Sequence, residues 1–208
     1  MNDFGLYVII SNPVLPYTEI AEICVSEGIR YLQLREKELS DRRILEISKD
    51  IISITKGSRT KFIINDRVDL AIISDADGVH LGQDDISIDQ ARRLLANDKI
   101  IGISTHNLKQ AENALLKTPD YIGFGPIFKT PTKKIPDPVL GTEQIPLLID
   151  LKNKMNNDTP FVAIGGIDYS NINEVIASGA KNFSLVRFLM ESPDLKKRLK
   201  MLKDLYLK

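Results

Sequence analysis

Two aspartates stand just after two successive apolar runs of the sequence. The run KFII is followed by Asn65 and Asp66, and the run GVHL is followed by a short polar segment that ends at Asp85. If these runs are neighbouring strands, the two carboxylates lie close together and repel each other unless a cation or a shared proton lies between them. Magnesium typically binds one or two protein carboxylates and completes its shell with water and substrate phosphate oxygens. The pair predicts a magnesium site, and capping of the following helices is the alternative role for each aspartate.

Cations follow other apolar runs and indicate an anionic substrate. Arg35 and Lys37 follow YLQL, and Lys133 lies in the loop 125–141 after YIGF, which has four prolines and is long enough to be a functional loop. Arginine and lysine beside a magnesium ion can hold a diphosphate and offset its charge as it leaves. Surface ion pairing in QLREK and a solvated turn at TPTKK are the ordinary alternatives.

Glycines, hydroxyls and histidines complete the set of candidate residues. Gly165 and Gly166 after the run FVAI would let a backbone approach an anion closely, and a tight turn is the alternative. Ser104 follows IIGI. His80 lies inside a predicted strand, which favours a structural role, whereas the role of His106 stays open.

Eight apolar runs alternate with amphipathic segments along the chain. The runs are GLYVII, YLQL, KFII, GVHL, IIGI, YIGF, FVAI and FSLV. The segments between them repeat their apolar residues at intervals of three and four, as helices do, and a capped final helix is expected to begin near Ser192. Apolar strands joined through helices are typical of a parallel sheet covered on both faces. Eight units favour a closed (β/α)8 TIM barrel over an open doubly wound sheet, with one domain over residues 1–208 and the candidate residues at the carboxyl ends of the strands.

The composition indicates which binding partners and which cellular compartment suit this protein. The 208 residues carry 28 basic and 28 acidic side chains, so no global field favours nucleic acid or an anionic membrane. The single cysteine, Cys24, fits a reducing cytosol and is expected to be buried. The first residues lack the pattern of a secretory signal, and no apolar run approaches membrane-spanning length, so we expect a cytoplasmic protein. A homodimer is left open as its oligomeric state.

Five segments, in this order, resemble the thiamine phosphate synthase family: QLREK, IINDRVDLA, ADGVHLGQDD, YIGFGPIFKTPTKK and VAIGGI. The resemblance extends from about Leu6 to Val186. It implies a (β/α)8 barrel that joins a hydroxymethylpyrimidine diphosphate to a hydroxyethylthiazole phosphate, with release of diphosphate. It implies no protein nucleophile, because cations and magnesium stabilise the departing diphosphate while the aminopyrimidine supports a carbocation.

The resemblance also implies roles for individual residues. Asp66 and Asp85 would bind magnesium. Arg35, Lys37, Ser104 and Lys133 would be the catalytic set. The pyrimidine diphosphate would contact these four together with Gln33 and Asn65. The thiazole phosphate would contact Thr130, Pro131, Thr132, Gly166 and the main chain at Val186 and Arg187.

One position departs from the family pattern and keeps alternatives open. The family usually has a small residue and then serine after the eighth strand, where this chain has Val186 and Arg187. Arg187 would either contact the thiazole phosphate or fill part of its pocket. A thiazole tautomerase would lack both aspartates and have a catalytic histidine in the region of Pro126. A barrel that binds a phosphorylated ligand without catalysis is the other alternative.

Overall fold

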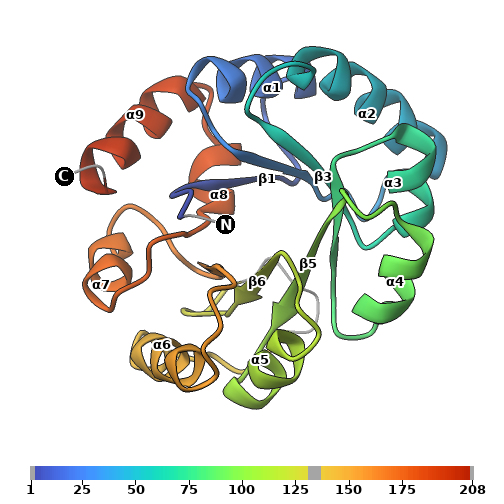
Figure 1. Cartoon of the computed structure of the whole chain (residues 1–208). Coiled ribbons are helices and arrows are strands. Elements are labelled where there is room, and N and C mark those ends of the chain that lie inside the picture. The colour runs from blue at the N-terminus through green and yellow to red at the C-terminus, as the bar shows by residue number, and fades with distance from the viewer. Residues whose placement is uncertain (1–2, 131–136, 207–208) are drawn as a thin grey trace.

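Parallel strands form a barrel inside a ring of helices (Figure 1). The structure is a computed structural model and describes residues 3–130 and 137–206. Seven strands pair in chain order within these residues. They are β1 (Tyr7–Ile10), β2 (Tyr31–Leu34), β3 (Lys61–Asn65), β4 (Gly78–Leu81), β5 (Ile100–Thr105), β6 (Tyr121–Phe124) and β7 (Phe161–Ala163). Neighbours are parallel throughout, as predicted for strands joined through helices.

The segment 182–184 closes the barrel between β7 and β1. Phe183 pairs with both Leu6 and Ala163 as isolated bridges. The backbone N–H of Tyr7 donates to the Phe183 carbonyl at 3.0 Å, and the Phe183 N–H donates to the Gly5 carbonyl at 3.0 Å. The closed barrel is therefore confirmed over the open sheet. The expectation of an extended eighth strand in FSLV was wrong, because a helix already begins at Val186.

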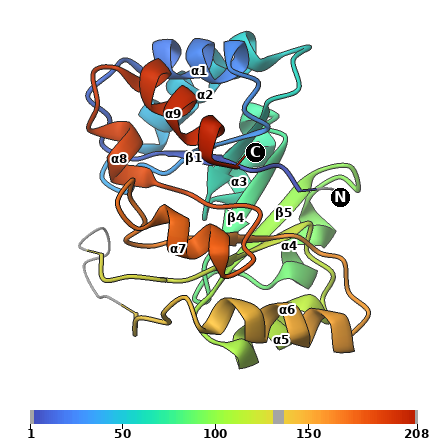
Figure 2. The ribbon, with the colours of Figure 1, turned by 90° about the vertical axis from the view of Figure 1, so that its left-hand side faces the viewer.

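Helices follow the strands and cover the outside of the barrel (Figures 1 and 2). They are α1 (Tyr17–Ser26), α2 (Asp41–Thr55), α3 (Val68–Ser74), α4 (Ile88–Leu94), α5 (Leu108–Leu115), α6 (Gln144–Lys154), α7 (Ile172–Ala177), α8 (Val186–Met190) and α9 (Leu195–Tyr206). The short helix α8 was not expected from the sequence. The final helix begins at Leu195 rather than near Ser192, since Asp194 accepts a hydrogen bond from the Lys197 N–H at 3.1 Å.

An ion pair connects the final helix, α9, to the end of the first helix, α1. Lys203 Nζ on α9 lies 2.9 Å from Glu27 Oε2 at the end of α1, and the Glu27 side chain is only 11% exposed. The lysine also donates to the Glu27 carbonyl. The hydrogen bond from Lys203 lowers the pKa of Glu27, so this carboxylate is ionised over a wider pH range than usual.

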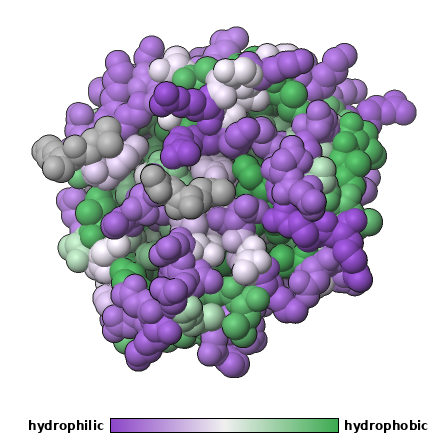
Figure 3. All heavy atoms as spheres, in the orientation of Figure 1, coloured by the Kyte–Doolittle hydropathy of each residue, from purple (hydrophilic) through white to green (hydrophobic). Residues whose placement is uncertain are grey.

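Two apolar clusters fill the molecule. The larger lies between the strands and the helices and contains Cys24, which is fully buried as predicted. Burial raises the pKa of its thiol to about 12. The smaller cluster fills the barrel interior and includes Phe4, Tyr7, Tyr31 and Tyr121. No helix in the described part of the chain is long and apolar enough to cross a membrane, and hydrophilic residues cover much of the face in Figure 3.

Candidate active site

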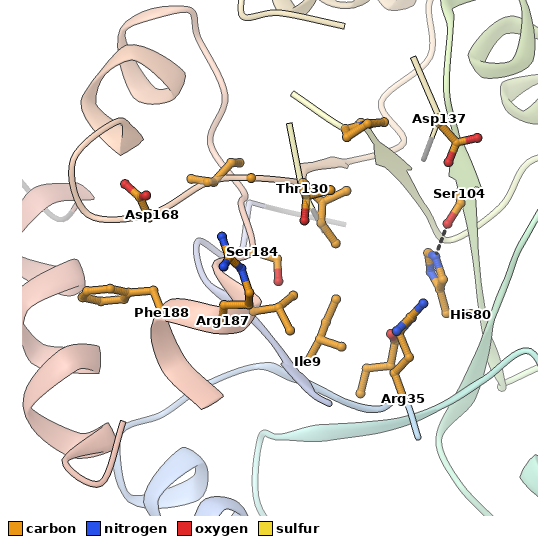
Figure 4. A pocket seen from close by; sticks show the side chains of 18 of the residues that line it. Ile9, Arg35, His80, Ser104, Thr130, Asp137, Asp168, Ser184, Arg187 and Phe188 are labelled. Carbon is orange, nitrogen blue, oxygen red and sulfur yellow. Dashed lines mark hydrogen bonds between the residues drawn. The ribbon is translucent and has the colours of Figure 1, made fainter. Parts of the chain in front are cut away.

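A cavity of about 340 Å³ opens at the carboxyl ends of the strands. Figure 4 shows side chains from several strand ends converging on it. Residues of the sequence prediction that line it are Gln33, Arg35, Asn65, Ser104, Thr130, Gly166, Val186 and Arg187. The barrel thus brings together residues that are up to 154 positions apart, because all parallel strands end at the same rim.

The loop after β2 directs its cations toward this rim. Glu36, between the two cations, is buried and accepts hydrogen bonds from the Asn12 N–H at 2.9 Å and the Tyr17 hydroxyl at 3.0 Å. Arg35 lines the cavity, and Lys37 Nζ lies 3.2 Å from Asp66 Oδ2. Burial lowers the pKa of the Arg35 guanidinium, while the Asp66 and Glu36 carboxylates oppose that shift.

Asp66 and Asp85 lie beside each other at the ends of β3 and β4. Asp66 has the left-handed φ of 61°, which aspartate tolerates better than most residues, and its N–H donates to the His80 carbonyl at 2.7 Å. Asp85 Oδ2 accepts from the Gly82 N–H at 2.6 Å. Burial raises the pKa of the Asp85 carboxyl and the neighbouring Asp66 carboxylate raises it further, against the Gly82 hydrogen bond. Bringing these two charges together is unfavourable unless a cation or a shared proton lies between them.

Helix capping does not account for either aspartate. The N-cap of α3 is Arg67, without a side-chain capping bond. The N-cap of α4 is Ser87, which forms a reciprocal capping box with Gln90. The capping alternative is therefore wrong for both residues.

The carboxylate pair fits a magnesium ion. In residues 3–130 and 137–206, no three or more of His, Cys, Asp and Glu gather as a metal cluster. A site of two carboxylates leaves most of the coordination shell to water and phosphate oxygens, which suits magnesium and not zinc. The exposed Lys37 beside Asp66 and the partly buried Arg35 add two cations near this pair.

Two glycines after β7 are required by close packing. Gly165 and Gly166 have φ of 94° and 67°. A Cβ on Gly165 would lie 2.5 Å from Pro126, and one on Gly166 would lie 2.7 Å from the backbone of Phe128. The loop after β7 therefore packs directly on the loop after β6, and this contact forms one wall of the cavity.

Arg187 lies on the same side of the cavity, in the first turn of α8. Hydrogen bonds from Ser170 lower the pKa of Asp168, and the charge of Arg187 adds to the shift. Figure 4 shows Arg187 and Asp168 together with Thr130 and Ser184 around this half of the cavity. Arg187 thus supplies a cation at a place where the family pattern has a serine.

The remaining predicted residues lie elsewhere. Lys37, Asp66 and Asp85 are not among the residues that line the cavity, although Lys37 and Arg35 both interact with Asp66. Pro131, Thr132 and Lys133 lie outside the described residues, so their predicted roles stay predictions.

The sequence reasoning missed several lining residues, among them His80 and Ser184. His80 was assigned a structural role, but its ring lines the cavity and its Nε2 lies 2.9 Å from Ser104 Oγ. Ser184 also lines the cavity, and its buried Oγ has no hydrogen-bond partner in the described part of the chain. The available signal was a polar residue within an apolar run, GVHL in one case and FSLV in the other.

Comparison with known proteins identifies the family. A family model described as thiamine monophosphate synthase matches residues 6–189. A thiamine-phosphate synthase of Pelotomaculum thermopropionicum is 44% identical over 186 residues, covering 89% of this chain and 83% of the relative. One from Lawsonia intracellularis is 41% identical over 187 residues, covering 89% and 83%. The solved structure of thiamine phosphate pyrophosphorylase from Pyrococcus furiosus has a TM-score of 0.86 and 32% identity, covering 99% of this chain and 96% of that one. The chain belongs to the thiamine monophosphate synthase family.

Proposed function

We propose that this protein condenses 4-amino-2-methyl-5-hydroxymethylpyrimidine diphosphate with hydroxyethylthiazole phosphate to give thiamine phosphate and diphosphate. The observation that carries the proposal is one cavity with residues suited to bind an anion on each of two sides. Arg35, with the nearby Lys37 and Asp66, lies on one side, and Gly166 with Arg187 lies on the other. Membership of the family supports the same reaction, since its named relatives are thiamine-phosphate synthases.

The first region would bind the diphosphate. Asp66 and Asp85 would hold a magnesium ion, which when bound neutralises part of the diphosphate charge. Arg35 and Lys37 would contact the phosphate oxygens, and Ser104 and Asn65 would donate hydrogen bonds to the same substrate. Partial burial of Arg35 strengthens its electrostatic interaction with an anion relative to an exposed arginine.

The second region would bind the thiazole phosphate. Gly166 and the first-turn backbone of α8 at Val186 and Arg187 would face the phosphate, because first-turn N–H groups have no acceptor within their own helix. Thr130 would add a hydroxyl, and the Arg187 guanidinium would add a charge-assisted contact. Pro131 and Thr132 complete this proposed set, whereas Lys133 belongs to the proposed set for the pyrimidine diphosphate.

The reaction then needs orientation more than acid–base chemistry. The bond between the pyrimidine methylene carbon and the diphosphate oxygen breaks, and its electron pair leaves with the diphosphate. The thiazole nitrogen lone pair forms the new bond to that carbon. Ile9 and Ile164 line the cavity and would exclude water from the electron-poor methylene. Holding the two substrates in line accounts for a large part of the expected acceleration.

A barrel that binds a phosphorylated ligand without catalysis is the second candidate. Arg187 favours it, because a large cation occupies the place where the family usually has serine. A thiazole tautomerase is less well supported, since both aspartates are present and Pro126 stands where that activity would need histidine. A cytoplasmic location and a homodimer remain predictions from the sequence.

The test is product formation by the purified protein. Both substrates and magnesium are supplied, and thiamine phosphate is measured by mass spectrometry beside a sample that contains EDTA. Magnesium-dependent product supports the synthase. Absence of product, with calorimetric binding of the pyrimidine diphosphate retained, would instead support the binding barrel.

A further inference from the structure

A continuous chain of side-chain hydrogen bonds runs through the barrel interior and reaches the cavity at both ends. Gln33 Nε2 donates to the Tyr7 hydroxyl at 3.1 Å. The Tyr7 and Tyr121 hydroxyls are 2.7 Å apart, and the Tyr121 hydroxyl is 3.0 Å from His80 Nδ1. His80 Nε2 is 2.9 Å from Ser104 Oγ, the contact drawn as a dashed line in Figure 4. Gln33 and Ser104 both line the cavity, and the tyrosines are nearly fully buried beneath it.

Glycines in β5 and β6 make room for this chain. A Cβ on Gly102 would lie 2.0 Å from Tyr121 Cζ, a separation at which the tyrosine ring could not stay in place. Gly102 is the register partner of Tyr121 in the β5–β6 pair. Gly123, on β6, lies next to His80, and a Cβ there would lie 3.4 Å from His80 Cε1. A buried tyrosine hydroxyl needs a hydrogen-bond partner. Here the Tyr7 and Tyr121 hydroxyls bond to each other, and the Tyr121 hydroxyl also bonds to His80.

With the Gln33 amide nitrogen facing Tyr7, the donors and acceptors along the chain follow one consistent direction. The Gln33 amide nitrogen can only donate, so the Tyr7 oxygen accepts and its proton goes to Tyr121. The Tyr121 proton then goes to His80 Nδ1, which leaves the proton of a neutral His80 on Nε2, where it is donated to Ser104. Burial raises the pKa of both tyrosine hydroxyls, so both protons are retained at neutral pH.

We propose that Tyr121 and His80 are positioning residues that hold Ser104 as a hydrogen-bond donor toward the bound substrate. Because Ser104 Oγ accepts from His80, its own proton is left for an acceptor in the cavity. Such a serine suits a ligand rich in anionic oxygens. The inference rests on the proposed function for the identity of that ligand, but the direction of the chain can be measured without it.

The opposite direction makes a different prediction for His80. It would require the Gln33 carbonyl to face Tyr7, a proton on His80 Nδ1, and donation from Ser104 to His80. Ser104 would then present only an oxygen lone pair to the cavity, which would repel a phosphate oxygen. The two directions therefore differ in the tautomer of one ring.

The tautomer of His80 can be measured by two-bond ¹H–¹⁵N correlation NMR of the ligand-free protein. The chain has only two histidines, His80 and His106, so a His106→Gln variant assigns the spectrum. His106 provides an internal contrast, because its Nδ1 donates to the Gly125 carbonyl at 2.6 Å. At about pH 8.5, above the ordinary imidazole pKa of about 6.5, we expect the Nε2–H tautomer at His80 and the Nδ1–H tautomer at His106. The Nδ1–H tautomer at His80 would overturn the proposal.

A Tyr121→Phe substitution tests whether the chain acts through Ser104. The substitution removes the donor to His80 Nδ1, so the two His80 tautomers should mix and its ¹⁵N signals should move toward averaged positions. We expect kcat/KM to fall roughly threefold to tenfold, the size of effect that loss of one hydrogen bond produces. Tyr31→Phe is the matched control, because Tyr31 packs in the same aromatic cluster but is not one of the described residues that link Gln33 to Ser104.

A double-mutant cycle separates positioning from general loss of structure. If Tyr121 acts through Ser104, the double variant Tyr121→Phe with Ser104→Ala should lose no more activity than Ser104→Ala alone. Multiplied losses would show that Tyr121 acts independently of Ser104 and would contradict the proposal. The same double-mutant cycle can be measured without turnover if the calorimetric affinity for inorganic diphosphate, with magnesium present, replaces the activity. If no synthase activity is found, the proposed function fails. The His80 tautomer would still show the direction of the hydrogen-bond chain, and the diphosphate affinities would still show whether Tyr121 acts through Ser104.

Discussion

Replacing Gly102 by alanine should strongly destabilise the protein, because the barrel interior has no room for one more methyl group at this place. The alanine Cβ would lie 2.0 Å from Tyr121 Cζ and 2.4 Å from its hydroxyl oxygen. Carbon atoms in contact are normally about 3.5 to 4.0 Å apart. The Tyr121 ring must therefore move by about 1.5 Å or more. A displacement of that size breaks its hydrogen bonds to Tyr7 and His80, which are now 2.7 and 3.0 Å long.

The expected loss can be worked out from these contacts. Overpacking of a core costs about 1 to 3 kcal/mol, and the two broken hydrogen bonds cost about 0.5 to 1.5 kcal/mol each. The free energy of unfolding should fall by about 2 to 6 kcal/mol in total. For a chain of this length each kcal/mol corresponds to about 2 to 4 °C in Tm, so the Tm should fall by roughly 4 to 24 °C.

Gly123→Ala is the control for this prediction. Its Cβ would meet His80 Cε1 at 3.4 Å and Ser104 Cα at 3.7 Å, which are ordinary contacts. Its stability should stay within about 1 kcal/mol of wild type, because alanine also lowers the conformational entropy of the unfolded chain. Urea denaturation of the three proteins, followed by circular dichroism, measures the difference. Equal stabilities of the Gly102→Ala and Gly123→Ala proteins would refute the packing argument.

Three further predictions address separate parts of the molecule. Ser184→Ala should raise the free energy of unfolding by about 1 kcal/mol, since its buried hydroxyl lacks a partner in the described residues; a lower urea midpoint would count against this. Arg187→Ser should raise KM for thiazole phosphate about tenfold, with a smaller effect on kcat, if the arginine contacts the phosphate; a lower KM would show instead that its bulk obstructs the site. Glu27→Gln should cost about 1 kcal/mol at pH 7 through the lost ion pair with Lys203. Because the folded-state pKa of Glu27 is lowered from 4.5, that stability is present above pH 4.5 and is lost as the pH falls through the folded pKa. The urea midpoints of wild type and variant should therefore converge in acid, and a constant difference would show that the charge is not responsible.

Much of the fold was accessible from the sequence because strands and helices differ in the period of their apolar residues. Runs such as YLQL and GVHL are short and apolar, and the structure places both as barrel strands. The eighth strand was overestimated for a physical reason. FSLV has the composition of a strand, but backbone pairing is restricted to Phe183, and the chain turns into α8 at Val186. Composition alone does not distinguish a single bridge from a strand.

The sequence could place a residue at the rim where it stands just after a strand, but not where it lies within one. Arg35 and Asp66 follow β2 and β3 closely, and the barrel topology then brings them to the same rim. His80 lies inside β4, and whether its ring faces the helices or the barrel interior is a matter of register that one sequence does not reveal. The chain from Gln33 to Ser104 likewise depends on contacts across the barrel between residues that are far apart in sequence.

The most direct test of the account is diphosphate release in the presence of both substrates and magnesium, compared between wild type and an Asp66→Asn, Asp85→Asn double variant. Asparagine keeps the size of each side chain and removes the charge that would hold the ion. The account predicts magnesium-dependent release of diphosphate with thiamine phosphate in equal amount by wild type, and a loss of at least a hundredfold, about 2.7 kcal/mol, in the double variant. The Tm of the double variant should be unchanged or higher, since two repelling carboxylates are removed. Magnesium-dependent turnover at the wild-type rate by the double variant would contradict the assignment of these two aspartates, and with it the proposed site.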